Sequence, residues 1–184
     1  AVKGVSKSGG AGASASSRAI ALVTSAGFAQ AYRRTGVSLS VSAIAGEGTG
    51  MERDHDYSAA CHFEDLKTPQ EVGKSAGERA VKRLNARKIA SQAVTVIYDR
   101  RVASSLLGHL SSAINGAAIA RGTSFLKSKM GQQIFSKGIS VIDDPLRLRG
   151  LASRPFDGEG LSSSRRELIA DGILTGWVLD LRSA

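Results

Sequence analysis

His109 is the histidine best placed for a helical metal site, because the residues around it repeat with a helical period. A His-Glu-x-x-His motif needs a second histidine about one turn after the first, so that both imidazoles face one metal ion. Ala113 and Ile114 occupy those positions here, and no glutamate occurs between Glu78 and Glu159. The segment therefore lacks the second ligand and the carboxylate base of a helical zinc hydrolase.

Cys61 is the single cysteine and the other candidate for covalent or metal chemistry. His62 follows it, and His55 lies seven residues before His62 in an expected strand, where alternate side chains point to opposite faces. A lone buried cysteine is more often a packing residue than a nucleophile. One cysteine allows no internal disulfide, which fits a reducing compartment such as the cytoplasm. Neither a Gly-x-Ser-x-Gly elbow nor a phosphate-binding loop occurs.

Four carboxylates are grouped in two turn-like stretches: Asp143 and Asp144 precede Pro145, and Asp157 and Glu159 lie among glycines. Together they could bind a cation or a basic group of a substrate. The alternative is that their oxygens cap and order the turns. No histidine joins the cluster, so turn ordering is the favoured interpretation.

The positive charge is concentrated in the middle of the chain. Of the 184 residues, 25 are Lys or Arg and 16 are Asp or Glu, and the net charge of +9 arises within residues 68–138. Such an excess could contact a phosphate backbone, or it could be the solvated face of a helix. No helix-turn-helix, zinc-finger or ribonucleoprotein pattern accompanies it. Six of these charges lie on or just after one predicted helix: Lys74, Arg79, Lys82, Arg83, Arg87 and Lys88.

The first third of the chain has the period of antiparallel strands. Residues 37–45 alternate Val, Leu, Val and Ala with serines, which indicates a strand with one buried face. Residues 18–24 form a second expected strand, and 26–35 and 52–62 are expected to pair beside them. Gly9–Ser17 is expected to be a mobile loop or hairpin tip.

The middle of the chain changes to a helical period. Thr68, Pro69 and Glu71 combine a capping box with a proline at the first helical position, so a helix should begin there. After it we expect, in order, a buried strand at 94–98, a helix capped by Asp99, a short helix over 125–134, a strand at 139–142 and a hairpin turning at Asp171–Gly172. No apolar run approaches the length of a membrane helix.

These elements predict an α+β fold with antiparallel strands in the first third, central helices, and closing strands with a C-terminal hairpin. We divide the chain into a β-rich part at 1–67, a linking helix at 68–90 and a final region at 91–184.

Several ungapped blocks of the sequence, occurring in order, resemble the TldD/PmbA family, also called the modulator of DNA gyrase family, and within it the PmbA (TldE) branch. The blocks are Ala-Ile-Asn-Gly at 113–116, Arg-Gly-Thr-Ser-Phe-Leu at 121–126, Asp-Asp-Pro at 143–145, Ser-Arg-Pro-Phe-Asp-Gly-Glu-Gly at 153–160 and Asp-Gly-Ile-Leu at 171–174. The resemblance implies that residues 1–67 belong to a middle region of longer family members. Residues 91–184 would begin their C-terminal region, so the chain would be an internal part of such a protein.

The resemblance also implies a division of labour between two kinds of subunit. The TldD-like kind carries His-Glu-x-x-x-His on the helix that matches residues 106–114, and is held to be the metallopeptidase subunit. Here Gly108, His109 and Ala113 stand at the three motif positions. The resemblance therefore implies a PmbA/TldE-like subunit with no catalytic residue or metal ligand of its own. It would be paired with a TldD-like subunit that holds zinc.

The function that the resemblance implies is the non-metal part of a TldD–TldE type metallopeptidase complex that acts on peptides in the bacterial cytoplasm. The alternative is a basic modulator of DNA gyrase that acts through DNA or topoisomerase binding, so nucleic acid stays a less favoured partner, and no membrane is expected. The candidate residues for a cleft or a structural motif are His109, Asn115, Arg121, Ser124, Asp143, Asp144, Asp157 and Glu159.

Overall fold

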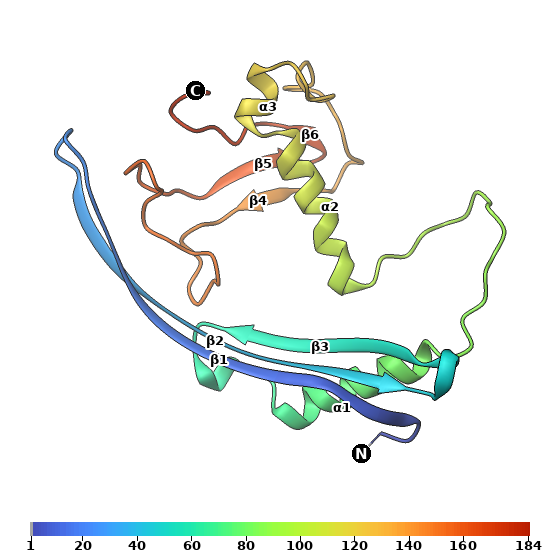
Figure 1. The fold of residues 1–184 in the computed structure, drawn as a ribbon. Helices are drawn as coiled ribbons and strands as arrows, with labels where there is room; N and C mark the ends of the chain where they lie inside the picture. The colour runs from blue at the N-terminus through green and yellow to red at the C-terminus, as the bar shows by residue number, and fades with distance from the viewer. Residues whose placement is uncertain (1) are drawn as a thin grey trace. The chain divides into compact units, whose positions relative to one another are not determined.

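The computed structural model describes residues 2–184 and divides into two compact units (Figure 1). Unit 1 comprises the residues up to Ser91 together with Arg147–Ser153. Unit 2 comprises Gln92–Leu146 and Arg154–Ala184. The chain is α+β, with antiparallel strands first, helices in the middle and a hairpin among the closing strands, as the sequence predicts. Within residues 2–184, no helix is long and apolar enough to cross a membrane.

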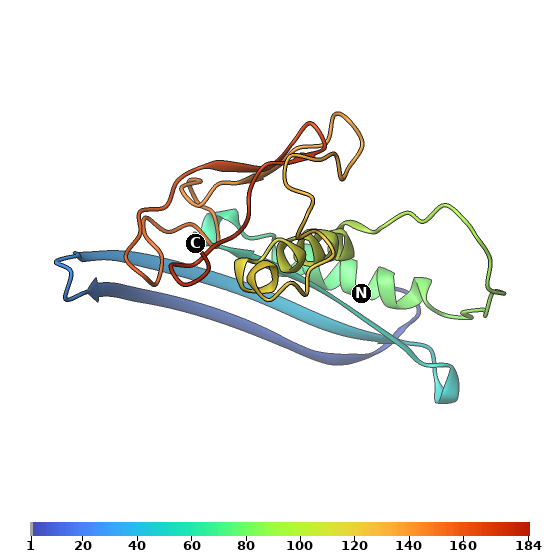
Figure 2. The same ribbon diagram turned by 90° about the horizontal axis from the view of Figure 1, so that it is seen from above.

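Unit 1 is built on an antiparallel sheet of strand order β1-β2-β3, with β1 at Val5–Val23, β2 at Ala29–Ala45 and β3 at Glu52–Ala60. The first two strands pair along their whole length, whereas β3 pairs only with the second half of β2, from Val37 onward. The distal part of β1 and β2 is therefore a two-stranded ribbon, which Figure 2 shows as a long curved pair. The short 3-10 helices η1 (Gly48–Gly50) and η2 (Phe63–Asp65) flank β3.

Gly9–Ser17 is part of β1, so the prediction of a loop there is wrong. The small residues of this stretch fit closely against the serine-rich half of β2. The hydroxyls of Ser14 and Ser38 lie 2.8 Å apart, and a Cβ on Gly9 would lie 2.7 Å from the hydroxyl of Ser42. Pairing with a neighbouring strand thus outweighs the low strand propensity of glycine and serine.

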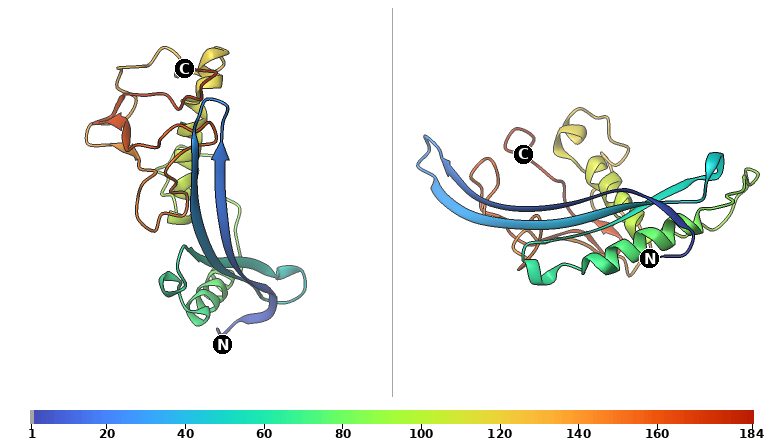
Figure 3. Two further views of the ribbon diagram at one scale, coloured as in Figure 1. Left: turned by 90° about the vertical axis from the view of Figure 1, so that its left-hand side faces the viewer. Right: turned by 60° about the horizontal axis from the view of Figure 1, so that its bottom comes forward.

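Helix α1 (Pro69–Lys82) covers one face of this sheet (Figure 3). Its capping box is formed as predicted: the Thr68 hydroxyl accepts a hydrogen bond from the Glu71 N–H, and the Glu71 carboxylate accepts one from the Thr68 N–H. Ala76 and Ala80 of the helix pack against Ala43 and Ala45 of β2. Alanines on both sides let the helix lie close to the sheet.

The Thr68 N–H and hydroxyl hold the pKa of Glu71 below its usual value, because both donate to the charged carboxylate. The stabilisation that this cap gives is present at pH values above the pKa that Glu71 has in the unfolded chain. It is lost as the pH falls through the lower pKa that Glu71 has in the folded chain.

Unit 2 combines helices α2 (Arg100–Ala113) and α3 (Gly116–Ala120) with a small antiparallel sheet of β4 (Val141–Asp143), β5 (Arg166–Ala170) and β6 (Ile173–Leu174). Asp99 caps α2 as predicted, by accepting a hydrogen bond from the Arg101 N–H. One apolar cluster joins α2 to the sheet, and Trp177 packs against it. Its buried members are Leu110, Ala113, Ile114, Leu126, Leu168, Ile169 and Leu174.

The turn at Asp171–Gly172 is confirmed, with φ angles of 47° and 84° that suit a tight hairpin turn. Two other predictions for unit 2 are wrong. Residues 94–98 are exposed and irregular, because no strand pairs with them. Residues 125–134 form turns rather than a helix, since Gly131 adopts φ 73° and the Ser124 hydroxyl bonds locally to the Leu126 N–H.

Candidate functional site

A cavity of about 530 Å³ lies beside α2 in unit 2. His109, which is exposed, lies on its wall, as does Ser124, which is buried. The remaining wall is mainly apolar and comes from α2, from residues 123–126 and from residues 134–135, including Leu106, Leu110, Phe125 and Phe135. Of the eight residues proposed from the sequence, the structure brings His109 and Ser124 to this cavity.

Ser124 fixes the loop after α3 to the end of α2. Its hydroxyl donates to the carbonyl oxygen of Ala113 at 2.5 Å and accepts from the Leu126 N–H at 3.0 Å. Both hydroxyl functions are therefore engaged inside the protein. The geometry makes Ser124 a structural part of the cavity wall rather than a free nucleophile.

Replacing Ser124 with alanine is expected to lower the free energy of unfolding by about 1–3 kcal/mol, because the carbonyl of Ala113 would lose a buried partner. Urea unfolding followed through the fluorescence of Trp177, which packs on the same core, measures this loss. Ser112→Ala is the control: Ser112 is exposed, and its hydroxyl donates to the carbonyl of Gly108 within the same helix. Equal losses in the two variants would contradict the structural role of Ser124.

Asn115 and Arg121 bound the short helix α3. The Asn115 side chain accepts a hydrogen bond from the Ala117 N–H at 3.1 Å, so it acts as the N-cap. Arg121 is the C-cap residue and is exposed. Gly116, which follows Asn115, permits close packing, because a Cβ there would lie 2.8 Å from Leu179 Cδ2.

The four carboxylates each have a partner within unit 2. Asp143 pairs with Arg166 at 3.1 Å, and Asp144 accepts a hydrogen bond from a backbone N–H two residues later. Asp157 accepts two backbone N–H groups at 2.9 Å within its own turn, and Glu159 accepts the Leu181 N–H at 2.9 Å. These contacts show how each carboxylate orders local structure.

The side chains of α2 do not supply the donor set of a zinc site. Gly108 and Ala113 carry no ligand atom, which leaves His109 as the one imidazole on the helix. A Cβ on Gly108 would meet open space, so the position has room for a side chain that the sequence does not provide. Across residues 2–184, no three His, Cys, Asp or Glu side chains are grouped so that they could hold a metal ion.

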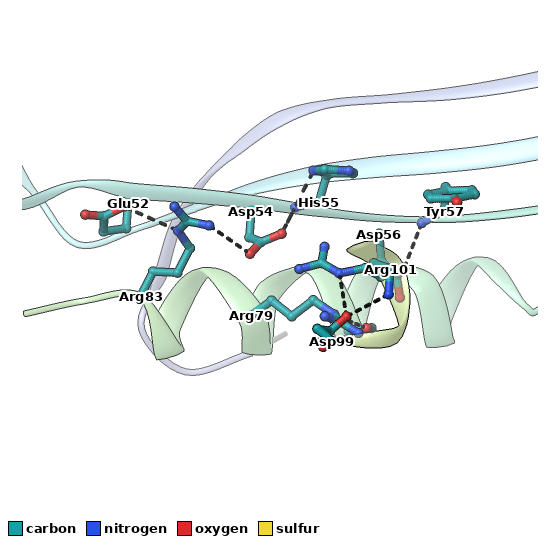
Figure 4. A network of polar contacts seen from close by, with 10 residues as sticks. Glu52, Asp54, His55, Asp56, Tyr57, Arg79, Arg83, Asp99 and Arg101 are labelled. Carbon is teal, nitrogen blue, oxygen red and sulfur yellow. Dashed lines mark hydrogen bonds and ion pairs between the residues drawn. The ribbon is translucent and has the colours of Figure 1, made fainter. Parts of the chain in front are cut away.

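The basic stripe is the set of six Lys and Arg side chains predicted on or just after the first helix. Three of them contact the chain's own polar groups. Arg83 pairs with Glu52 at 3.6 Å and with Asp54 at 3.5 Å, as Figure 4 shows. Lys74 lies 3.8 Å from Glu78, and Arg79 donates to the Ser75 hydroxyl at 3.2 Å. The carboxylates of Glu52, Asp54 and Glu78 thus offset the charges of Arg83 and Lys74.

Sequence reasoning missed the two buried carboxylates of β3, Asp54 and Asp56, which are 7% and 3% exposed. Burial acts to raise the pKa of Asp56, but hydrogen bonds from the Ser75 hydroxyl and the Tyr57 N–H favour the charged form. The nearby charges of Lys67 and Arg79 add to this, and the pKa falls below its usual value. One signal in the sequence could have revealed these carboxylates. The acidic residues occupy every second position in the first half of β3, opposite the basic helix.

A second cavity, of about 960 Å³, lies in unit 1 on the sheet face next to the start of α1. We call it the ribbon groove. Its floor consists of residues 11–15 of β1 and 37–41 of β2, where Ala13 and Leu39 face each other. Residues 63–64 and 66–69 form its side. Phe63 stands 78% exposed at this side. The groove continues the same sheet face that α1 covers further along.

Cys61 lies close to this side of the sheet and is half-buried. Its thiol donates to the carbonyl of Gly150 at 3.6 Å, and the Cys61 carbonyl accepts a hydrogen bond from the Thr35 hydroxyl at 2.8 Å. Arg149 pairs with Asp65 at 2.6 Å in the same region. Cys61 therefore helps to hold the segment 147–153 in unit 1.

Two family models together match nearly the whole chain. Residues 1–84 match the PmbA/TldA metallopeptidase central domain, and residues 91–184 match the PmbA/TldA metallopeptidase C-terminal domain. The metalloprotease PmbA of Escherichia coli O157:H7 is 42% identical over 86% of this chain and 35% of its own length. A PmbA homolog of Haemophilus influenzae is 35% identical over 83% of this chain and 34% of its own length. The chain thus spans about a third of these relatives.

Solved structures agree with these matches. A Bacteroides thetaiotaomicron crystal structure that carries the gyrase-modulator name superimposes with a TM-score of 0.87 at 28% identity, over 92% of this chain and 39% of the other. The crystal structure of TldE from Thermococcus kodakarensis shares the fold, with a TM-score of 0.69 at 22% identity, over 92% of this chain and 38% of the other. From its domain matches, its relatives and its fold, the chain belongs to the PmbA/TldD family of metallopeptidase-like proteins.

Proposed function

We propose that this chain is part of a PmbA/TldE-like subunit that binds peptide but holds no catalytic zinc. It would act with a TldD-like subunit that supplies zinc and hydrolyses the peptide in the cytoplasm. The observation that carries the proposal is the donor set of α2, in which Gly108 and Ala113 stand on either side of His109. A zinc peptidase needs three protein ligands and a base, and this helix offers one imidazole.

The peptide contribution of the subunit is best assigned to unit 1. Among the described residues, β1 has β2 as its sole strand neighbour, so its outer edge can pair with an extended peptide through main-chain hydrogen bonds. The ribbon groove lies on the same two strands, and its floor is lined by Ala13, Leu39 and other small or apolar side chains. Such a site would accept unfolded peptides with little sequence preference, because main-chain contacts carry no side-chain information.

The test is peptide cleavage by full-length proteins, with a fluorescence-quenched unstructured peptide as the substrate. The protein that contains this chain should show no cleavage alone, and its mixture with the TldD-like subunit of the same genome should cleave faster than that subunit alone. Cleavage by the isolated protein, or a mixture no faster than the partner, would contradict the proposal.

Matched tryptophan variants test the role of the groove in the same assay. Ala13→Trp fills the groove and should lower cleavage by the mixture at least tenfold. Ala59→Trp places the same side chain at an exposed position of β3 outside the groove and should leave cleavage unchanged. Equal rates in the two variants would remove the groove from the peptide path while leaving the two-subunit scheme intact.

The gyrase-modulator alternative depends on direct contact between the basic stripe and DNA. The ion pairs of Arg83 with Glu52 and Asp54 disfavour it, because phosphate would compete with two carboxylates already in place. Binding of the full-length protein to duplex DNA with a steep loss of affinity in salt would restore this alternative.

A further inference from the structure

The ribbon formed by residues 16–36, here called the arm, carries positive charge without any counter-charge. It contains Arg18, Arg33 and Arg34, and no Asp or Glu occurs before Glu47 in the whole chain. All three arginines are exposed, and among the described residues none of them makes an ion pair. Figure 3 shows the arm running beyond the part of the sheet that β3 extends.

Two of these arginines are placed against each other by the strand register. Arg18 of β1 lies directly opposite Arg34 of β2, so both side chains leave the same face of the arm. Like charges in this arrangement destabilise a strand pair. A carboxylate bound between the two guanidinium groups would convert this repulsion into two charge-assisted hydrogen bonds. Beside the pair, Ser16 and Gly36 are small and leave access to it.

Apolar side chains surround the charges on both faces of the arm. Ile20 and Tyr32 form the next pair on the face of Arg18, and both are half-buried. On the other face, the next cross-strand pair after Arg33 toward the tip is formed by Ala31 and Ala21, which are both exposed. Val23 near the tip is 76% exposed. A two-stranded ribbon is marginally stable alone, so this mixture of apolar and cationic surface is typical of a segment that packs on another protein.

We propose that the arm docks on an acidic surface of the TldD-like subunit, with a carboxylate between Arg18 and Arg34 and apolar side chains against the rest of the arm; the identity of this partner rests on the function proposed above. Charge complementarity defines the chemistry of the surface. A protein that binds a phosphate backbone typically makes six to ten phosphate contacts. The arm offers three cations, and exposed alanine and valine side chains surround them, so a phosphate backbone is a poor match.

A second copy of the chain is a poorer match for the arm. Several carboxylates of unit 1 already have cations of their own, among them Asp54 with Arg83 and Asp65 with Arg149. A copy that received the arm at these carboxylates would have to break the existing pairs. An external acidic surface has no such cost.

The experiment measures the dissociation constant of the two full-length subunits by isothermal titration calorimetry, at low and at high salt. Arg18→Glu with Arg34→Glu should weaken binding at least about 30-fold and abolish its salt dependence, because both partners of the bound carboxylate are reversed. Arg147→Glu with Arg165→Glu, which reverses two exposed arginines outside the arm, should change the affinity less than threefold. Circular dichroism confirms folding, and Arg18→Gln with Arg34→Gln gives an intermediate loss.

The outcomes separate the two proposals. Unchanged affinity in the arm variant, together with tight wild-type binding, overturns the docking inference and leaves the two-subunit function standing. No binding of the wild-type proteins to each other overturns both. Self-association of the isolated protein that the arm variant abolishes would assign the arm to a second copy, and duplex DNA binding that it abolishes would assign the arm to nucleic acid. Either result contradicts the inference.

Discussion

Replacing Ile114 with alanine is expected to lower the free energy of unfolding of unit 2 by about 2–5 kcal/mol. Ile114 is fully buried in the apolar cluster that joins α2 to the small sheet, and truncation would leave a cavity there. Its backbone is also central, because its carbonyl accepts the Val178 N–H at 2.9 Å. That segment near the end of the chain depends on the position of Ile114.

The fluorescence of Trp177, the single tryptophan, reports the unfolding of this unit, because the ring packs on the same cluster. Ile142→Ala is the control: Ile142 is 44% exposed on β4, so the same truncation there should cost less than about 1 kcal/mol. A loss at Ile114 no larger than at Ile142 would show that the cluster is not the core of unit 2.

Replacing Gly172 with alanine is the second change with a large expected effect, a loss of about 2–4 kcal/mol in the free energy of unfolding. Gly172 adopts φ 84° in the turn between β5 and β6, a conformation that costs other residues about 1 kcal/mol or more. A Cβ would also collide with the carbonyl oxygen of Phe135, and the Gly172 carbonyl accepts the N–H groups of Ile134 and Phe135. The turn therefore anchors the wall of the α2 cavity.

The variant Gly138→Ala separates the cost of the positive φ angle from the cost of the Cβ collision. Gly138 adopts φ 85°, almost the same angle, but a Cβ there would meet no atom within 4 Å. Urea unfolding of the two variants should give a smaller loss for Gly138→Ala, and the difference is the cost of displacing the Phe135 carbonyl. Equal losses would mean that the backbone angle alone decides the effect.

Short sequence patterns correctly predicted the two helix caps and the hairpin turn. Thr68 with Glu71 and Asp99 cap their helices, and Asp171–Gly172 turns the hairpin, because capping and turn geometry depend on neighbouring residues. The strand at Gly9–Ser17 could not be found in this way, since its stability comes from the serine-rich strand opposite. The strand predicted at 94–98 fails for the converse reason, as apolar β-branched residues need a partner strand.

The candidate site was partly predictable. The absence of a zinc donor set on α2 follows from residue identities alone, because Gly108 and Ala113 have no ligand atoms. The groove on β1 and β2 and the opposed pair Arg18 and Arg34 depend on strand register, which the sequence does not specify without the pairing. The excess charge of residues 68–138 did not point to the arm, because the carboxylates from Glu47 onward offset the arginines of the arm in the charge count of residues 1–67.

The most direct test of the central claim is the zinc content of the two full-length subunits, purified separately with zinc in the buffers and analysed by inductively coupled plasma mass spectrometry. The subunit that contains this chain should hold no stoichiometric zinc, since α2 offers one imidazole where a catalytic site needs three ligands. The TldD-like subunit should hold one zinc per chain. One tightly held zinc per chain in the first subunit, together with peptidase activity in the absence of the second, would contradict the proposed function.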